Sequence, residues 1–272
     1  YCSKLTSIEI PNSVTSIGVR AFENCSKLIS LLIPKSVTSI DNSAFRSCSS
    51  LESIVVENDN TVYDSRNDCN AIVETSTNTL YIGCKNTVIP NTVASIGKYA
   101  FYNCDYLTSI EIPNSVTSIG DRAFYDCFGL TSIEIPNSVT SIGESAFSFC
   151  SKLTSIEIPN SVTSIGESAF LWCSHLRSIK CHAVDVPVTA TNAFNNCPED
   201  MNIQVPEESV ALYQAAEPWK NYNVTEIHLY QIGDYVVVDY EGYSLRYTII
   251  NVEPAECEVI CETKPTTEIS IT

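Results

Sequence analysis

Thirteen cysteines are the residues of this chain with the clearest capacity for chemistry, because thiolates act as nucleophiles, metal ligands and disulfide partners. Eight of them recur at one position of a repeating pattern: Cys2, Cys25, Cys48, Cys104, Cys127, Cys150, Cys173 and Cys197. Zinc needs four ligands that converge on one point, whereas regular spacing spreads thiols along a line. Thiols that all point in one direction also reach the disulfide dihedral with difficulty. We therefore predict a ladder of buried free thiols, with stacked disulfides or a metal site as alternatives.

The three histidines and the abundant hydroxyl groups do not form a catalytic pattern. His175, His182 and His228 have no nucleophile and carboxylate at a spacing that predicts a triad. Serines recur at fixed repeat positions, as at Ser109 and Ser132, which favours a structural role. The sequence holds no glycine-rich phosphate loop and no metal-ligand motif. We predict that the chain is not an enzyme and has no cofactor.

These residues are positioned by a repeat of 23 residues. The stretch LTSIEIPNSVTSIGDRAFYDC at 107–127 returns almost unchanged at 130–150 and 153–173. The phenylalanines of the Ala-Phe pairs keep the same step: Phe101, Phe124, Phe147 and Phe170, with Phe22 and Phe45 in an earlier block. A fixed period in this range predicts a solenoid, in which each turn buries its apolar residues against the next turn.

Within one turn, the apolar spacing predicts two short strands and a corner. The pattern LxxIxI over 107–112 is typical of a strand with one apolar face, and Pro113 ends it because proline has no N–H. Val116 and Ile119 point inward from a second extended run. Gly120 permits a bend, and Asp121 is expected to cap a brief helical turn. The residue before the proline position marks nine strands: Ile10, Ile33, Val56, Ile89, Ile112, Ile135, Ile158, Cys181 and Val205.

The pattern LxxIxIPxxVxxIGxxAFxxCxx resembles the BspA-type, or Treponema-type, leucine-rich repeat over residues 1 to about 206. The resemblance implies a right-handed leucine-rich repeat solenoid of short parallel strands with brief helical turns. It also implies a secreted or surface-anchored bacterial protein, and it brings no catalytic residues. Some members of the family are implied to act as adhesins toward host matrix proteins or other cell surfaces.

The net charge of −17 limits the classes of partner. Nucleic acids and anionic lipid surfaces require patches of lysine and arginine, and the chain has no such run. No apolar stretch is long enough to insert into a membrane. The chain opens in the middle of a repeat at Tyr1, so we expect further turns upstream and infer an extracellular or cell-surface location from the resemblance alone. We favour a monomer.

The repeat period breaks after the third strand, because the segment 58–84 lacks the Ala-Phe signature. We interpret this segment as an inserted hairpin, with 69–75 and 78–84 as its strands. Cys69 would then lie opposite Cys84, either as a cross-strand disulfide or with Cys84 as a core residue in a leucine position.

The repeat becomes irregular again near its C-terminal end. We predict that the solenoid extends over 1–229 and that a helical segment at about 207–222 caps it. Val210, Leu212, Tyr213 and Trp219 are expected to plug the open end of the core. Residues 230–272 predict a small β meander, with strands at 235–240, 245–252, 258–261 and 268–271. We interpret the meander as the lead-in to a further module.

The candidate ligand-binding positions lie on the concave face of the predicted sheet, between the buried isoleucines. One repeat position reads Leu32, Val55 and Val88 on successive strands and then Glu111, Glu134 and Glu157. An exposed apolar strip with a polar rim is a binding-site candidate, unless the hairpin folds over it and makes a second core. The glutamates predict a solvated face, with cation binding such as Ca²⁺ as the alternative.

Three functions from different classes remain open. The leading hypothesis is a secreted or cell-surface module that binds protein through its concave face or the hairpin, with host matrix or another cell surface as the partner. The second is a passive stalk that displays another domain, which near-identical repeats favour. The third is a glycan-binding module, although aromatic platforms are missing from the concave positions.

Overall fold

The computed structural model of the chain describes residues 2–227, 235–240, 243–253 and 256–261. The chain divides into two compact units, Tyr1–Glu226 and Ile227–Thr272, and each is described by itself. The strand predicted over 268–271 and His228 lie outside the described residues.

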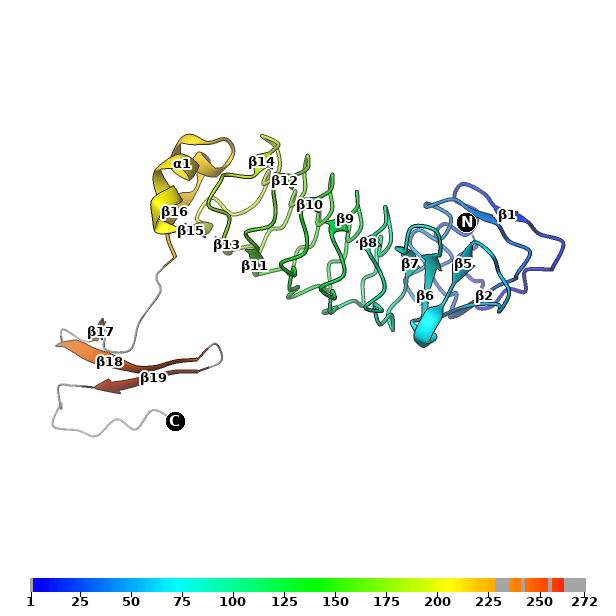
Figure 1. Ribbon diagram of the computed structural model, residues 1–272, viewed down its shortest axis with the longest axis horizontal. Coiled ribbons are helices and arrows are strands. Elements are labelled where there is room, and N and C mark those ends of the chain that lie inside the picture. Colours follow the sequence, from blue (N-terminus) through cyan, green and yellow to red (C-terminus); the bar gives the residue numbers. More distant parts are fainter. Residues whose placement is uncertain (1, 228–234, 241–242, 254–255, 262–272) are drawn as a thin grey trace. The chain divides into compact units, whose positions relative to one another are not determined.

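Two ladders of short parallel strands run along the stacked turns of the first unit (Figure 1). The first ladder contains β2 (Ser30–Ile33), β4 (Ser53–Val56), β11 (Ser155–Ile158), β13 (Ser178–Cys181), β15 (Asn202–Val205) and β16 (Asn223–Glu226). The second contains β1 (Ser16–Ile17), β3 (Ser39–Ile40), β8 (Ser95–Ile96), β9 (Ser118–Ile119), β10 (Ser141–Ile142), β12 (Ser164–Ile165) and β14 (Val188–Thr189). The register pairs Ser155 with Ser178 and Ser141 with Ser164, one repeat apart, which confirms the solenoid.

The core is a stack of identical layers, because each turn places the same side chain above its counterpart. The rings of Phe124 and Phe147 are parallel and their centroids lie 5.3 Å apart. Phe101 stacks on Phe124 in the same way at 5.1 Å. All three rings are fully buried, as the repeat predicts.

The corners between the two ladders are runs of turns, where a brief helical turn was expected. Their N–H groups alternate between local partners and the next turn of the solenoid. The N–H of Phe124 donates to the carbonyl of Ala146 at 2.8 Å, whereas the N–H of Ala123 donates within its own corner to Gly120. Positive φ angles at Arg122 and Asp126 support this alternation. Bonds to the neighbouring turn thus replace the bonds that would extend a helix.

The segment predicted as an inserted hairpin forms β5 (Tyr63–Asp64), β6 (Ala71–Glu74) and β7 (Thr79–Gly83), with the 3₁₀ turn η1 (Arg66–Asp68) between β5 and β6. β6 pairs antiparallel with both β5 and β7, and β7 pairs in parallel with β8. They therefore extend the part of the second ladder from β8 to β14 into one sheet of eight strands, in the order β14-β12-β10-β9-β8-β7-β6-β5, whereas β1 and β3 form a separate pair.

This segment lies across the inside of the solenoid and separates two hydrophobic cores. Ala71 and Val73 belong to the core of the later turns, whereas Ile72, between them, belongs to the core of the first turns. Leu80 and Ile82 on β7 divide in the same way. All five side chains are buried.

The C-terminal cap consists of η2 (Glu207–Ser209), α1 (Val210–Ala215) and η3 (Trp219–Asn221), followed by β16. Tyr213 and Trp219 are fully buried and pack edge to face at 5.0 Å. Val210 packs against the same core. Leu212 is exposed, so the expectation that it plugs the core was wrong, because its neighbour Tyr213 occupies the inward side of this short helix.

The second unit contains β17 (Tyr235–Tyr240), β18 (Tyr243–Glu253) and β19 (Glu256–Cys261). The strands pair antiparallel in the order β17-β18-β19, which is a meander.

Candidate functional site

The repeated thiols form a ladder of hydrogen bonds. In five of the eight, Cys48, Cys127, Cys150, Cys173 and Cys197, the Sγ–H donates to the carbonyl of the phenylalanine one turn earlier, at 3.0 Å from Cys127 to Phe101 and 3.2 Å from Cys150 to Phe124. Cys2 is exposed, so the prediction that all eight are buried was wrong at this position. Cys173 repeats this contact at 3.1 Å. All eleven cysteines of residues 2–227 are free, and the residues that the structure describes contain no cluster of ligands for a metal ion.

Burial makes the five hydrogen-bonded thiols unreactive. It raises the pKa of Cys127, Cys150 and Cys173 well above the ordinary value of 9.0. It raises the pKa of Cys48 and Cys197 to about 12. Because the thiolate is the reactive form, the ladder has a packing role rather than a chemical one.

Cys69 and Cys84 lie on opposite sides of the wall that β6 and β7 form. Cys69 belongs to the core of the later turns and Cys84 to the core of the first turns. Both are free, which resolves the choice between a disulfide and a core residue in favour of the core.

Leu32 and Val55 are brought together on the exposed side of the first ladder. They are direct partners in the parallel register of β2 and β4, and 47% and 46% of their surfaces are exposed. Ile29, just before β2, is also half exposed. The inserted segment runs through the core beneath this face, so it does not cover the pair. We call the exposed side of the first ladder the strand face.

Val88 is separated from this pair. It is highly exposed, but its N–H donates to the carbonyl of Cys69 at 3.1 Å. On the side of β4 away from β2, the N–H of Val56 donates to Oγ of Ser65 at 3.0 Å and not to the segment that carries Val88. Among the described strands β4 pairs only with β2, so the apolar strip contains two adjacent residues where three were expected.

Glu111 and Glu134 line an open groove of about 720 Å³ on the later turns of the strand face, together with Ser109 and Ser132. Both glutamates are exposed. Glu157 pairs with Glu134 across the ladder through a single bridge. Its carboxylate lies 3.7 Å from Nζ of Lys180 and 3.2 Å from Nε2 of His182, so the next turn supplies a counter-charge.

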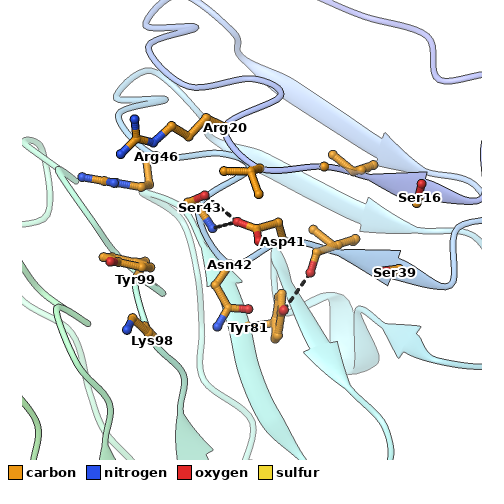
Figure 2. A pocket seen from close by; sticks show the side chains of 14 residues that line it. Ser16, Arg20, Ser39, Asp41, Asn42, Ser43, Arg46, Tyr81, Lys98 and Tyr99 are labelled. Carbon is orange, nitrogen blue, oxygen red and sulfur yellow. Dashed lines mark hydrogen bonds between the residues drawn. The ribbon is translucent and has the colours of Figure 1, made fainter.

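A second groove, of about 760 Å³, lies beside the second ladder where the third turn lacks its corner (Figure 2). Arg20, Arg46 and Lys98 come from three different turns, and Figure 2 shows all three toward one end of the groove. Ser16 and Ser39 lie toward the other end. Sequence reasoning missed this site, although the missing Ala-Phe signature at 58–84 was the signal for it.

The family model for the BspA-type leucine-rich repeat region matches residues 1–78 and 76–202 in six copies. The chain belongs to the BspA-type leucine-rich repeat family. A comparison with curated proteins found no match.

Solved structures of similar chains are bacterial leucine-rich repeat proteins. A leucine-rich cell surface protein from Faecalibacterium prausnitzii is 31% identical with a TM-score of 0.64, over 79% of this BspA-type chain and 63% of its own. The pneumococcal vaccine antigen PcpA is 20% identical, with a TM-score of 0.60, over 83% of this chain and 69% of PcpA. A leucine-rich repeat protein from Eubacterium ventriosum is 23% identical, with a TM-score of 0.51, over 81% of this chain and 54% of its own. The last two comparisons support the fold alone.

Membership of the BspA-type family and the extent of the matches limit the functions that the comparisons support. The chain spans about 63% of the length of the Faecalibacterium protein. Leucine-rich repeat proteins of this family are typically non-catalytic interaction modules. None of the helices in the described residues has the length and apolar character needed to cross a membrane.

Proposed function

We propose that this chain is a non-catalytic, extracellular or cell-surface module that binds a protein partner through its strand face. The observation that carries the proposal is the exposed apolar pair of Leu32 and Val55, at positions where the later turns carry glutamate. Such a pair gains free energy when a partner covers it, because burying apolar surface contributes roughly 25 cal/mol per Å².

Charged groups flank the strands that carry the apolar pair. Lys85 and Glu52 form an exposed ion pair at 3.2 Å beside β4. Glu57 accepts a hydrogen bond from the N–H of Lys35 at 3.0 Å, close to the ends of β2 and β4. An apolar centre with a polar rim is the usual anatomy of a protein interface. Rim charges tune the rate and specificity of association more than its affinity.

A binding screen against purified fibronectin, laminin and collagen tests the proposal. The variant carrying Leu32→Glu and Val55→Glu should lose binding, while its melting temperature stays nearly unchanged because both side chains are half exposed. Val184→Glu with Val188→Glu is the matched control, since it makes the same change at two exposed valines far along the chain. Glu111→Gln with Glu134→Gln should have a smaller, salt-dependent effect.

The alternative is a passive stalk. The near-identity of the repeats at 107–173 favours it, because a recognition face usually varies from one turn to the next. If the intact chain binds none of the matrix proteins, or if the double glutamate variant folds and binds as before, the stalk becomes the preferred function.

A further inference from the structure

The groove in Figure 2 exists because one corner of the solenoid is missing. In a regular turn, corner N–H groups donate to carbonyls of the following corner, as Phe124 does to Ala146. The corner at 41–48 lacks such a neighbour. Within the described residues the N–H groups of Phe45 and Ser47 meet no acceptor, and the N–H of Ser43 turns back to the carboxylate of Asp41 at 2.9 Å. The break therefore leaves main-chain donors without the partners that a following corner would supply.

Three cations gather at one end of this groove with their donors unused. The side chains of Arg20, Arg46 and Lys98 make no hydrogen bond within the part of the chain that the structure describes. Their nearest carboxylates lie beyond hydrogen-bond length: Glu23 at 3.6 Å from Arg20 and 3.9 Å from Arg46, and Asp121 at 3.6 Å from Lys98.

Three other arginines of the chain have guanidinium groups that donate hydrogen bonds to nearby side chains. Nε and Nη2 of Arg66 donate to Asp64 at 2.8 and 2.7 Å, and its Nη1 donates to Asn78. Arg122 and Arg177 each form a hydrogen-bonded ion pair with a carboxylate of the following turn, Glu144 and Asp200. The free donors of Arg20 and Arg46 are thus a property of the groove.

Arg46 is held in position before any ligand arrives. Its guanidinium carbon lies 4.0 Å from the centroid of Tyr102 and 4.9 Å from that of Tyr99. Its side chain is only 17% exposed, and its Nε is buried without a partner among the described residues. Stacking on two aromatic rings fixes the planar guanidinium, so less entropy is lost when it binds an oxyanion.

The rest of the groove presents small hydroxyl and amide groups. Ser16 and Ser39 are exposed, and Asn42 lines the groove between them and the cations (Figure 2). Hydrogen bonds from Ser43 lower the pKa of Asp41, so its carboxylate is an acceptor at neutral pH. Such groups match the hydroxyls of a sugar.

A peptide strand is a poorer fit for this groove, because the free edge of β3 is already occupied. The hydroxyl of Tyr81 donates to the carbonyl of Ile40 at 2.7 Å, and the N–H of Ile40 donates to the hydroxyl of Tyr63 at 3.1 Å. These tyrosines take the main-chain groups that an added strand would need.

We propose that this groove binds an acidic saccharide, with the anionic group of a sugar ring clamped between Arg20, Arg46 and Lys98. The hydroxyls of the same or the next ring lie against Asn42, Ser16 and Ser39. A carboxylate and a sulfate offer the same oxyanion chemistry to the guanidinium groups, and both occur on sugars. The site is separate from the strand face, so it stands or falls independently of the proposed protein partner.

Titration calorimetry with four probes tests the proposal: a tetrasaccharide of hyaluronan, a tetrasaccharide of heparin, the neutral tetramer of N-acetylglucosamine, and tetraglutamate. At least one acidic saccharide should bind, and the neutral tetramer should bind about tenfold more weakly or worse. Whichever of hyaluronan and heparin binds more tightly identifies the anionic group as carboxylate or sulfate.

Two double variants locate the site. Arg20→Gln with Lys98→Gln should weaken the acidic saccharide about tenfold or more without lowering the melting temperature, because both side chains are largely exposed. Lys27→Gln with Lys152→Gln removes the same charge from two exposed lysines outside the groove and should leave binding unchanged. Leu32→Glu with Val55→Glu should also bind the saccharide normally.

Three outcomes overturn the proposal. The first is that neither acidic saccharide binds at millimolar concentration. The second is that Lys27→Gln with Lys152→Gln weakens binding as much as Arg20→Gln with Lys98→Gln does, which would indicate non-specific charge attraction. The third is that tetraglutamate binds as tightly as the saccharides and responds to the same variant, which would assign the groove to acidic peptides.

Discussion

The thiol ladder predicts a steep loss of stability at alkaline pH. Cys127, Cys150 and Cys173 have pKa values held far above 9.0 by burial, and Cys48 and Cys197 have pKa values of about 12. In the unfolded chain the same thiols ionise near pH 9. Each thiol therefore contributes its full stability below pH 9 and loses it as the pH rises toward the value in the folded state.

The magnitude follows from the proton count. Above the unfolded value, each buried thiol loses about 1.4 kcal/mol of stability per pH unit. Five thiols together then lose about 7 kcal/mol per unit, which is comparable with the whole stability of a typical domain. Because solenoid turns can unfold in groups, we expect a broad transition rather than a single sharp one.

Urea unfolding followed by circular dichroism at pH 7.5, 8.5 and 9.5, under reducing conditions, measures this loss. Cys150→Ala is the internal test, because its loss of stability with pH should be shallower by one thiol. A free energy of unfolding that stays constant from pH 7.5 to 9.5 would refute the reasoning, since it would mean that the thiols are ionised or exposed in the folded chain.

Three further predictions concern the packing of the turns and the state of the cysteines. Phe124→Ala should lower the free energy of unfolding by about 3–5 kcal/mol, because the ring is fully buried between two others. Phe128→Ala, at a ring that is 42% exposed, should lower it by less than about 1 kcal/mol. Equal losses in urea unfolding would show that the buried side of the turn is wrongly assigned. Gly83→Ala should cost about 1–3 kcal/mol, because a Cβ there would lie 2.2 Å from the buried ring of Phe101. Gly18→Ala, with nothing within 4 Å, is its control, and similar melting temperatures for the two would contradict the close contact. Thiol labelling of unfolded, unreduced protein should find most of the thirteen cysteines free, and labelling of the native protein should be slow; a majority of blocked thiols would mean that the ladder is cross-linked.

The repeat made the solenoid predictable because one period specifies every layer at once. The position of Phe124 in the repeat is enough to place Phe101 and Phe147 above and below it. The exposure of Leu32 and Val55 followed from the same period, since the residues on either side of each are buried. Irregular parts of the chain carry no such repetition, and there the predictions were less complete.

The inserted segment shows where sequence reasoning stopped short. Ala71, Ile72 and Val73 form an uninterrupted apolar run, which is typical of a strand buried on both faces. That run was evidence for a wall inside the core, and a surface hairpin would have shown alternation. The separation of Val88 from Val55 follows from this wall, because Cys69 takes the place beside Val88.

The second groove was beyond a residue-by-residue prediction. Arg20, Arg46 and Lys98 are unremarkable corner residues in the sequence, each on a different turn. Only the missing corner brings them to one end of a groove, and the distances from their nitrogens to the nearest carboxylates decide whether their donors are free.

The most direct test of the central claim is to find which surface of the chain touches a partner. A photoreactive benzoylphenylalanine replaces Leu32 in one variant and Val188, also highly exposed, in another. Each variant is irradiated with whichever matrix protein the screen shows to bind, and cross-linked chains are identified by mass spectrometry. We predict cross-links from position 32 and none from position 188. Cross-links from position 188 alone would contradict the claim that this protein binds its partner through the strand face.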